Sequence, residues 1–281
     1  MGHLRDRMIQ DMKLRGFSLR TREAYVSVVY QLARYFRKSP EDLEEEDLRD
    51  YFLYLIEKRK LAPRSINVHK SGLRFVYEHT LQQPMMVLRQ IKPAIPKDLP
   101  VVMSEAEVRK ALFHVRRPVY RTALTLIYGC GLRLGEGLRV EIGDIDGELG
   151  RLHVRNGKGN KDRYALLPKR LHDLLQQFWI DHRPSGVLLF QAQKKPSPIH
   201  PSTIRKAFYQ GCETAGITKK VKIHTLRHSY ATHLLARGVS IRVIQRSLGH
   251  RSLQSTQRYS HITGDVESSA RKVIDDLMSD L

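Results

Sequence analysis

The sequence is poor in cysteine and has no long apolar run, and both absences narrow the class of protein. Its two cysteines, Cys130 and Cys212, lie far apart and lack the CxxC spacing of a thiolate metal site. We therefore expect neither a disulfide scaffold nor a zinc–thiolate centre, and a reducing cytoplasm fits. No apolar stretch approaches the roughly 18 residues of a membrane span, and we see no secretion or lipidation signal. Association with a membrane is not expected.

Acidic residues are scarce relative to basic ones. The 281 residues include 29 Asp and Glu against 49 Lys and Arg, which gives a net charge of +20 and a pI near 10.1. Such an excess indicates a polyanionic partner, because clustered Lys and Arg bind phosphates and release counterions. We expect nucleic acid as the partner and no small-molecule substrate. A hydrophobic content of 41% supplies enough core for a chain of two domains.

Apolar periodicity in the first 90 residues predicts an all-helical domain. Residues 18–38 carry apolar side chains at helical spacing. A second helix is expected after the acidic segment 41–47, and a third after Pro63. The predicted core positions are Tyr25, Val28, Val29, Leu32 and Phe36 in the first helix, Leu48, Phe52, Leu55 and Ile56 in the second, and Ile66, Leu73, Val76 and Tyr77 in the third.

The segment 91–103, IKPAIPKDLPVVM, predicts an extended connector, because its three prolines interrupt helices. A second domain, 104–281, opens with Ser104 and Glu107 at capping-box spacing. Its other expected elements are a buried helix over 119–128, a hairpin of strands 151–156 and 162–167, and helices near 168–182, 202–215, 225–237 and 240–248. This domain is therefore helical with one small sheet.

Polar residues open the helix predicted from HTLRHSYATHLLARG, which runs from His224 to Gly238. Thr225 is the expected N-cap and Gly238 the expected stop. His224 and Arg227 then point toward one ligand at the positive end of the helix. An anion there is bound by free amides and by a guanidinium that pairs with two phosphate oxygens. Taken alone, the pattern fits an ordinary capped helix with surface polar residues equally well.

Three further segments each place a basic residue at the end of a helix or in a turn. GCGLRLGE follows a buried helix and contains Arg133, GKGNKDR fills the hairpin turn and contains Lys158, and LGH ends a helix at His250. Nine residues later, Tyr259 stands in STQRYSH, a polar run where a core tyrosine is not expected. In order and spacing, these segments resemble the signature boxes of the tyrosine recombinase (phage integrase) family, especially its compact Xer-type members. The resemblance covers nearly the whole chain.

The resemblance implies a mainly α fold: an N-terminal helical, SAM-like core-binding domain (1–90), a Pro-rich linker (91–103) and a C-terminal mixed α+β catalytic domain (104–281) with a small antiparallel sheet. Residue by residue, it assigns Arg133 and Arg227 to the catalytic arginines, Lys158 to the hairpin lysine, His224 and His250 to the catalytic histidines, and Tyr259 to the nucleophile. Gly135 and Gly137 depart from the pattern, where a serine and a larger apolar residue are expected. Each glycine is predicted to loosen its helix by about 1 kcal/mol relative to alanine.

The implied activity is site-specific DNA recombination through a 3′-phosphotyrosyl intermediate with a free 5′-hydroxyl, without metal or nucleotide cofactor. The two arginines bind the phosphate where many nucleases use divalent metals. Lys158 is the expected general acid for the 5′ oxygen, and His224 the expected base toward the Tyr259 proton. His250 is expected to hydrogen-bond the phosphate. Because the tyrosyl ester retains the bond energy, rejoining needs no ATP.

Contacts with the DNA backbone are expected from five other basic residues: Arg64, Lys70, Arg74, Lys161 and Arg163. A solvated helix face is the alternative for the first three. Lys158 has the alternative of a simple turn residue, with Lys161 or Arg163 in its role. Glu136 is expected to orient the Arg133 segment.

Histidines 224, 228 and 233 are numerous enough for a zinc site. Their offsets do not place all three on one helical face, however, and no adjacent carboxylate completes the set. We therefore expect no metal, and hydrogen-bonded structural roles for His228 and His233.

An apolar stripe over 266–281 predicts an amphipathic helix that needs a groove. It packs either on its own domain or, as the resemblance implies, on a neighbouring protomer. Recombination of two duplexes needs four strand cuts, so a homo-tetramer is expected on DNA. Three alternatives are a DNA-binding accessory protein that never cuts, a type IB topoisomerase-like enzyme and a metal-dependent nuclease. The six catalytic residues argue against the first, and the stripe and compact length against the second.

Overall fold

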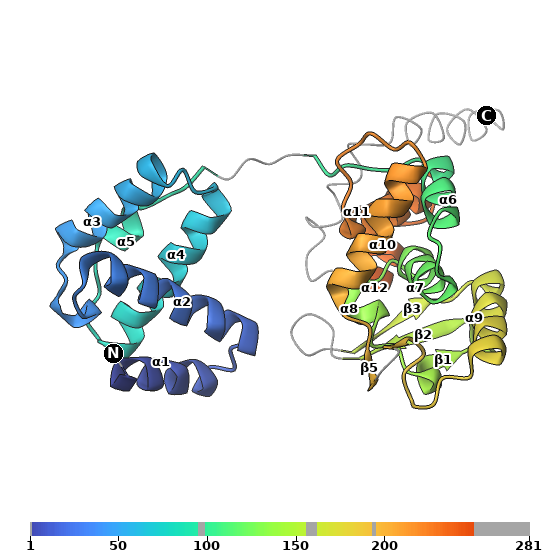
Figure 1. The fold of residues 1–281 in the computed structure, drawn as a ribbon, viewed down its shortest axis with the longest axis horizontal. Coiled ribbons are helices and arrows are strands. Elements are labelled where there is room, and N and C mark those ends of the chain that lie inside the picture. The colour runs from blue at the N-terminus through green and yellow to red at the C-terminus, as the bar shows by residue number, and fades with distance from the viewer. Residues whose placement is uncertain (1, 95–98, 156–161, 193–194, 250–281) are drawn as a thin grey trace, which may run out of the picture. The chain divides into compact units, whose positions relative to one another are not determined.

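The computed structural model describes residues 2–94, 99–155, 162–192 and 195–249. The chain divides into two units, Met1–Asp98 and Leu99–Leu281 (Figure 1). Each unit has its own apolar core. The division falls within the Pro-rich segment. No helix in the described ranges combines the length and apolar character that crossing a bilayer requires.

The N-terminal unit contains helices and no strand among its described residues. Its elements are α1 (Gly2–Leu14), α2 (Leu19–Phe36), the 3-10 turn η1 (Pro40–Asp42), α3 (Glu45–Leu53), the π-helical turn η2 (Tyr54–Lys58), α4 (Pro63–Phe75), the π-helical turn η3 (Val76–Thr80) and α5 (Val87–Gln90). The three predicted helices are confirmed as α2, α3 and α4, and η2 and η3 extend the latter two. Helix α1 was not among the predicted helices.

The core of this unit explains why these helices form. Leu32, Leu48 and Leu73 are fully buried, which confirms the predicted apolar faces. Leu4, Met8 and Met12 recur at four-residue spacing and bury one side of α1 in the same core. One predicted core position, Ile56, is wrong, since it is 49% exposed.

The C-terminal unit combines helices with two small antiparallel sheets. Its elements are α6 (Glu105–Phe113), α7 (Pro118–Gly129), α8 (Leu134–Gly137), η4 (Ile142–Asp144), β1 (Ile145–Asp146), β2 (Arg151–Val154), β3 (Arg163–Leu166), α9 (Lys169–His182), β4 (Gln191–Ala192), β5 (Lys195–Pro198), α10 (Pro201–Thr214), α11 (Ile223–Ala236) and α12 (Ile241–Leu248). The strand order is β1-β2-β3 in one sheet and β4-β5 in the other. The fold is mainly helical with a small antiparallel sheet, as the sequence predicts.

Helix boundaries in this unit follow local capping chemistry. The capping box is confirmed, because Ser104 Oγ accepts from the Glu107 amide and the Glu107 carboxylate accepts from the Ser104 amide. The predicted N-cap of α11 is wrong. The helix begins at Ile223, and the Thr225 hydroxyl, one turn inside, accepts from the amide of Lys222, the actual N-cap. His224 therefore lies within the first turn and not before it.

The buried helix predicted over 119–128 is α7, and it determines how close α8 approaches. A Cβ added to Gly137 would lie 2.5 Å from Cγ1 of Ile127, which is fully buried in α7. The expectation that Gly137 merely loosens a helix is therefore wrong. Its missing side chain allows α8 to pack directly on α7, which fixes the segment that carries Arg133 and Glu136.

We predict that Gly137→Ala lowers stability. Overpacking a rigid core costs about 1–3 kcal/mol, which exceeds the roughly 1 kcal/mol that alanine gains from helix propensity. Urea denaturation at neutral pH measures the difference. Gly143→Ala is the matched control, because nothing lies within 4 Å of its added Cβ. A Gly137→Ala protein at least as stable as wild type would contradict the packing explanation.

Candidate active site

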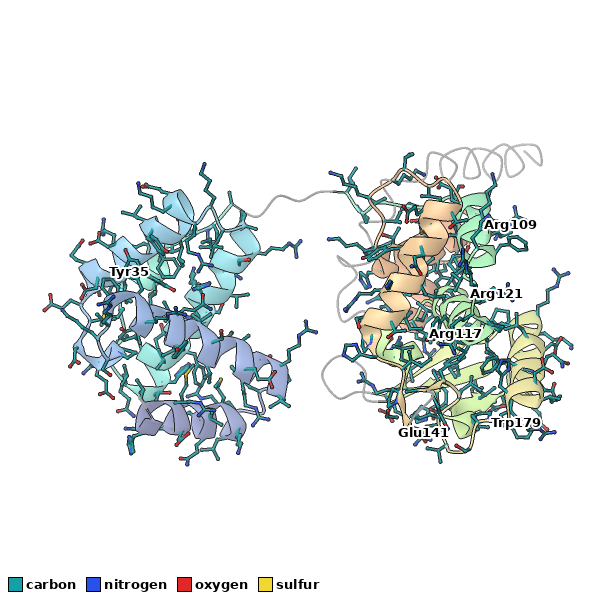
Figure 2. The ribbon with its side chains drawn as sticks, in the orientation of Figure 1. Tyr35, Arg109, Arg117, Arg121, Glu141 and Trp179 are labelled. Atoms are coloured by element: carbon teal, nitrogen blue, oxygen red, sulfur yellow. The ribbon has the colours of Figure 1, made fainter. Side chains whose placement is uncertain are left out.

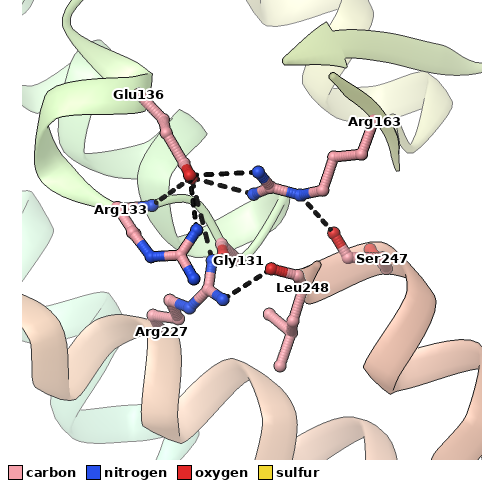
Figure 3. Close-up of polar contacts among 7 residues, drawn as sticks. All are labelled: Gly131, Arg133, Glu136, Arg163, Arg227, Ser247 and Leu248. Atoms are coloured by element: carbon pink, nitrogen blue, oxygen red, sulfur yellow. Dashed lines mark hydrogen bonds and ion pairs between the residues drawn. The ribbon is translucent and has the colours of Figure 1, made fainter. Parts of the chain in front are cut away.

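Three arginine side chains converge on the Glu136 carboxylate, which is 8% exposed (Figure 3). Arg133, immediately before α8, donates from its backbone amide at 2.8 Å and from Nη1 at 2.6 Å. Arg163, at the start of β3, donates from Nη1 at 3.0 Å and from Nη2 at 2.8 Å. Nη1 of Arg227, on α11, lies 3.8 Å from Glu136 Oε2. Segments far apart in sequence therefore meet at one carboxylate.

The Arg227 guanidinium holds three segments together. It is 1% exposed and donates from Nη1 to the carbonyl of Gly131 at 2.7 Å and from Nη2 to the carbonyl of Leu248 at 2.6 Å. Gly131 follows α7, and Leu248 ends α12. Because a guanidinium offers several N–H donors in a fixed plane, one side chain positions both backbone segments. The second of them runs on directly to His250.

The charge of Glu136 is stabilised by these neighbours. Burial by itself would raise the pKa of this carboxyl group. Hydrogen bonds and the positive charge of Arg163, followed by the hydrogen bonds from Arg133, outweigh burial and lower the pKa to about 2. Glu136 is therefore ionised at neutral pH. Three guanidinium groups against one carboxylate leave two positive charges in excess at this place.

Arg163 is nearly buried, and its hydrogen-bond donors are already engaged by protein acceptors. Its side chain is 11% exposed, and besides Glu136 it donates from Nε to the carbonyl of Ser247 at 3.0 Å. Gly249 packs against it, since an added Cβ would lie 2.6 Å from Arg163 Cδ. The predicted phosphate contact is corrected to a structural role: Arg163 joins β3, α8 and the end of α12.

His224 lies at the surface beside the arginines. Its ring contacts that of His228 edge-on, with ring centroids 4.6 Å apart. Desolvation by the surrounding protein, together with the positive charges of Arg227 and Arg133, lowers the pKa of His224 below its ordinary value of 6.5. The imidazole is therefore neutral at pH 7 and able to accept a proton.

His233 has the structural role predicted for it. One ring nitrogen, Nε2, lies 2.9 Å from the carbonyl of Met103, and the other, Nδ1, lies 2.8 Å from the Tyr128 hydroxyl. A carbonyl only accepts, so Nε2 carries the proton and Nδ1 accepts from Tyr128. Burial lowers the pKa of His233 and keeps the ring neutral. In the described part of the chain, no group of three or more His, Cys, Asp or Glu side chains is arranged to hold a metal ion.

The remaining predicted site residues lie either in the N-terminal unit or outside the described ranges. Arg64 and Arg74 are exposed on α4, and Arg74 pairs with Glu78 at 3.7 Å. Lys70 is half-buried and donates to the carbonyl of Ile91 at 2.6 Å, which ties α4 to the chain after α5. Lys158, Lys161, His250, Tyr259 and the stripe 266–281 lie outside the described residues.

Comparison with known proteins supplies the family. Residues 102–265 match the phage integrase family, and residues 4–86 match the N-terminal SAM-like domain of phage integrases. The chain belongs to the tyrosine recombinases of the phage integrase family. It is 34% identical to the tyrosine recombinase XerA of Pyrococcus furiosus over 257 residues, which cover 90% of this chain and 87% of that protein.

Solved structures share the fold. XerH site-specific recombinase bound to a palindromic difH substrate matches with a TM-score of 0.74 and 22% identity, over 93% of this chain and 82% of that chain. A lambda integrase tetramer bound to a Holliday junction matches with a TM-score of 0.75 and 18% identity, over 94% of this chain and 77% of that chain. At these identities the likeness establishes the architecture of this recombinase.

We predict that Glu136→Gln destabilises this recombinase at neutral pH by about 3 kcal/mol, because a carboxyl pKa lowered from 4.5 to about 2 reflects roughly that much interaction with the ionised form. The lowered pKa gives stability that is fully present above pH 4.5 and is lost as pH falls toward 2. Between pH 7 and 3.5, the difference between wild type and variant should therefore narrow by roughly 1 kcal/mol. Urea denaturation at both pH values measures it.

Glu148→Gln is the matched control, because Glu148 is exposed between β1 and β2. Its stability should follow that of wild type at both pH values. A difference between Glu136→Gln and wild type that stays constant from pH 7 to 3.5 would refute the electrostatic origin.

Proposed function

We propose that this site-specific recombinase cuts DNA by attack of the Tyr259 oxygen on a backbone phosphate and rejoins it by the reverse step. The P–O bond to Tyr259 forms as the bond to the 5′ oxygen breaks, which leaves a 3′-phosphotyrosyl ester and a 5′-hydroxyl. The observation that carries the proposal is the convergence of Arg133 and Arg227, two family-box residues, on Glu136, with His224 close enough to feel the charges of all three.

The arginines are suited to stabilise charge on the phosphate. The Arg133 side chain is 28% exposed, and its Nε and Nη2 have no partner among the described residues. Glu136 holds the guanidinium in place without cancelling the local excess of positive charge. A phosphate approaching this place gains hydrogen bonds from donors that are already oriented, so little reorganisation is needed in the transition state.

His224 is the proposed base. Its lowered pKa makes the neutral ring the main form at pH 7, so it is ready to take the phenolic proton as Tyr259 attacks. Lys158 is the proposed acid that protonates the departing 5′ oxygen, and His250 the proposed hydrogen-bond donor to the phosphate. These two roles and that of Tyr259 rest on the family boxes in the sequence.

The proposed assembly is a cytoplasmic homo-tetramer on DNA, with residues 266–281 docked on a neighbouring protomer. Two duplexes require four strand cuts, and one structural neighbour is a lambda integrase tetramer on a Holliday junction. The net charge of +20 supports contact with DNA phosphates. Arg64, Lys70 and Arg74 on α4 remain the proposed contacts of the N-terminal unit, and Lys161 a proposed contact of the C-terminal unit.

We predict a covalent protein–DNA adduct with wild type and none with Tyr259→Phe. The probe is a duplex selected by wild-type protein from a random-sequence pool and then nicked beside the cleavage point, so that the short product diffuses away and religation fails. The phenylalanine variant lacks the attacking oxygen but should bind the same duplex in a gel-shift assay. An adduct that persists in Tyr259→Phe, or its loss in EDTA with wild type, would refute the proposed chemistry.

We also predict the position of the acid limb in the pH profile of single-turnover cleavage. A general base works only when unprotonated, so the rate should fall as pH drops through the pKa of His224, which lies below 6.5. In His224→Ala the rate should be lower and this limb absent. A wild-type limb centred at pH 7 or above would contradict the assignment of His224 as the base.

A further inference from the structure

A second buried carboxylate lies beside the hairpin of β2 and β3, on the face opposite to Glu136. Asp144, which ends η4, is 3% exposed, and its Oδ2 accepts from the backbone amide of Glu141 at 2.9 Å. Its Oδ1 lies 2.5 Å from Nε of Arg155 and 3.5 Å from Nδ1 of His153. Arg155 also places Nη1 3.0 Å from Glu141 Oε2. Figure 2 labels Glu141 at the lower edge of the C-terminal unit.

These contacts extend to the other strand of the hairpin. Nε2 of His153 lies 3.1 Å from Oδ2 of Asp162, the residue directly before β3. The last ladder pair of the two strands is Val154 with Arg163. Arg155 and Asp162 therefore stand at the two points where the chain leaves the ladder. Asp144 reaches Arg155 directly and Asp162 through His153.

Strand geometry separates this network from the arginine cluster. Side chains alternate between the two faces of a strand, so Val154 and its partner Arg163 point inward and His153 points to the opposite face. Arg155 and Asp162 lie just outside the ladder, and their contacts with Asp144 and His153 place them on the same outer side. On the inner face Arg163 is held by Glu136 of α8. On the outer face Arg155 is held by Asp144 of η4. Two acidic residues from one short segment thus hold both faces of the hairpin base.

We propose that the Asp144–Arg155–His153–Asp162 network is a positioning device for strand cleavage, which fixes the base of the hairpin so that Lys158 reaches the departing 5′ oxygen. This inference rests on the proposed function, because it takes Lys158 as the general acid. In sequence, Lys158 lies three residues after Arg155 and four before Asp162. Proton transfer requires hydrogen-bond distance, and a misplacement of about 1 Å can cost about a hundredfold in rate.

A leaving-group substitution tests the network. With the normal oxygen, the P–O5′ bond breaks and the oxygen needs a proton. With sulfur at this bridging position, the P–S bond breaks and the less basic thiolate leaves without one. We expect Arg155→Gln to slow single-turnover adduct formation about tenfold to a hundredfold on the oxygen duplex. On the sulfur duplex of the same selected sequence it should react within about threefold of wild type.

Arg151→Gln is the matched control. Arg151 lies on the same face of β2 and also pairs with an aspartate, with Nε 3.0 Å from Asp146 Oδ2, but at the opposite end of the strand. It should match wild type on both duplexes. Arg155→Lys, which keeps the charge, should recover part of the oxygen rate. Thermal melting of each variant shows whether the fold is retained.

Two reference variants separate the possible failures. Lys158→Ala should be slow with oxygen and restored by sulfur, whereas Arg227→Lys should be slow with both. The network has no positioning role if the sulfur duplex restores the cleavage rate of Lys158→Ala but not that of Arg155→Gln. The same conclusion follows if Arg155→Gln cleaves the oxygen duplex as fast as wild type. If the sulfur duplex fails to restore the cleavage rate of Lys158→Ala, Lys158 is not the general acid, and the proposed role of the network is refuted as well.

Discussion

A carboxylate buried among three guanidinium groups organises the catalytic unit of this recombinase. Taking the Glu136 charge out of water is unfavourable, and only the hydrogen bonds and positive charges of its neighbours make the ionised form the stable one. The constraint acts in both directions. Arg163 and Arg227, which are almost inaccessible to solvent, need a nearby negative charge and carbonyl acceptors as much as Glu136 needs them. The segments that carry these side chains are therefore held together by electrostatics as well as by the apolar core.

The same cluster links segments with different roles in the proposed reaction. Arg133 lies at the partly exposed rim, where a phosphate can approach, whereas Arg227 lies behind it and binds backbone carbonyls. Arg163 connects the hairpin strand to the same carboxylate. The network around Asp144 repeats this arrangement on the other face of the hairpin. A hairpin held on both faces gives its turn a fixed base, which suits a loop expected to deliver a catalytic lysine.

Two histidines on α11 show how environment decides the role of one residue type. His233 has a partner on each ring nitrogen, so its ring is held in one tautomer and serves packing. His224 lies at the surface next to two arginines, whose positive charges disfavour the protonated ring. Burial lowers the pKa of both, yet only His224 lies where the proposed reaction needs a base.

The sequence by itself determined the helical N-terminal domain, the hairpin, the helices after it and the family, because apolar periodicity, capping residues and boxes such as GLRLGE and HTLRH are local patterns. It also indicated that Glu136 orients the Arg133 segment. Only the tertiary structure decided which way Arg163 faces. Pairing with β2 places Ala165 opposite buried Leu152 and turns Arg163 inward, which leaves Tyr164 and Leu166 exposed on the other face.

The sequence also could not predict that Gly137 packs closely on Ile127, or which groups Arg227 binds. Both depend on contacts between segments whose distance and orientation no local pattern encodes.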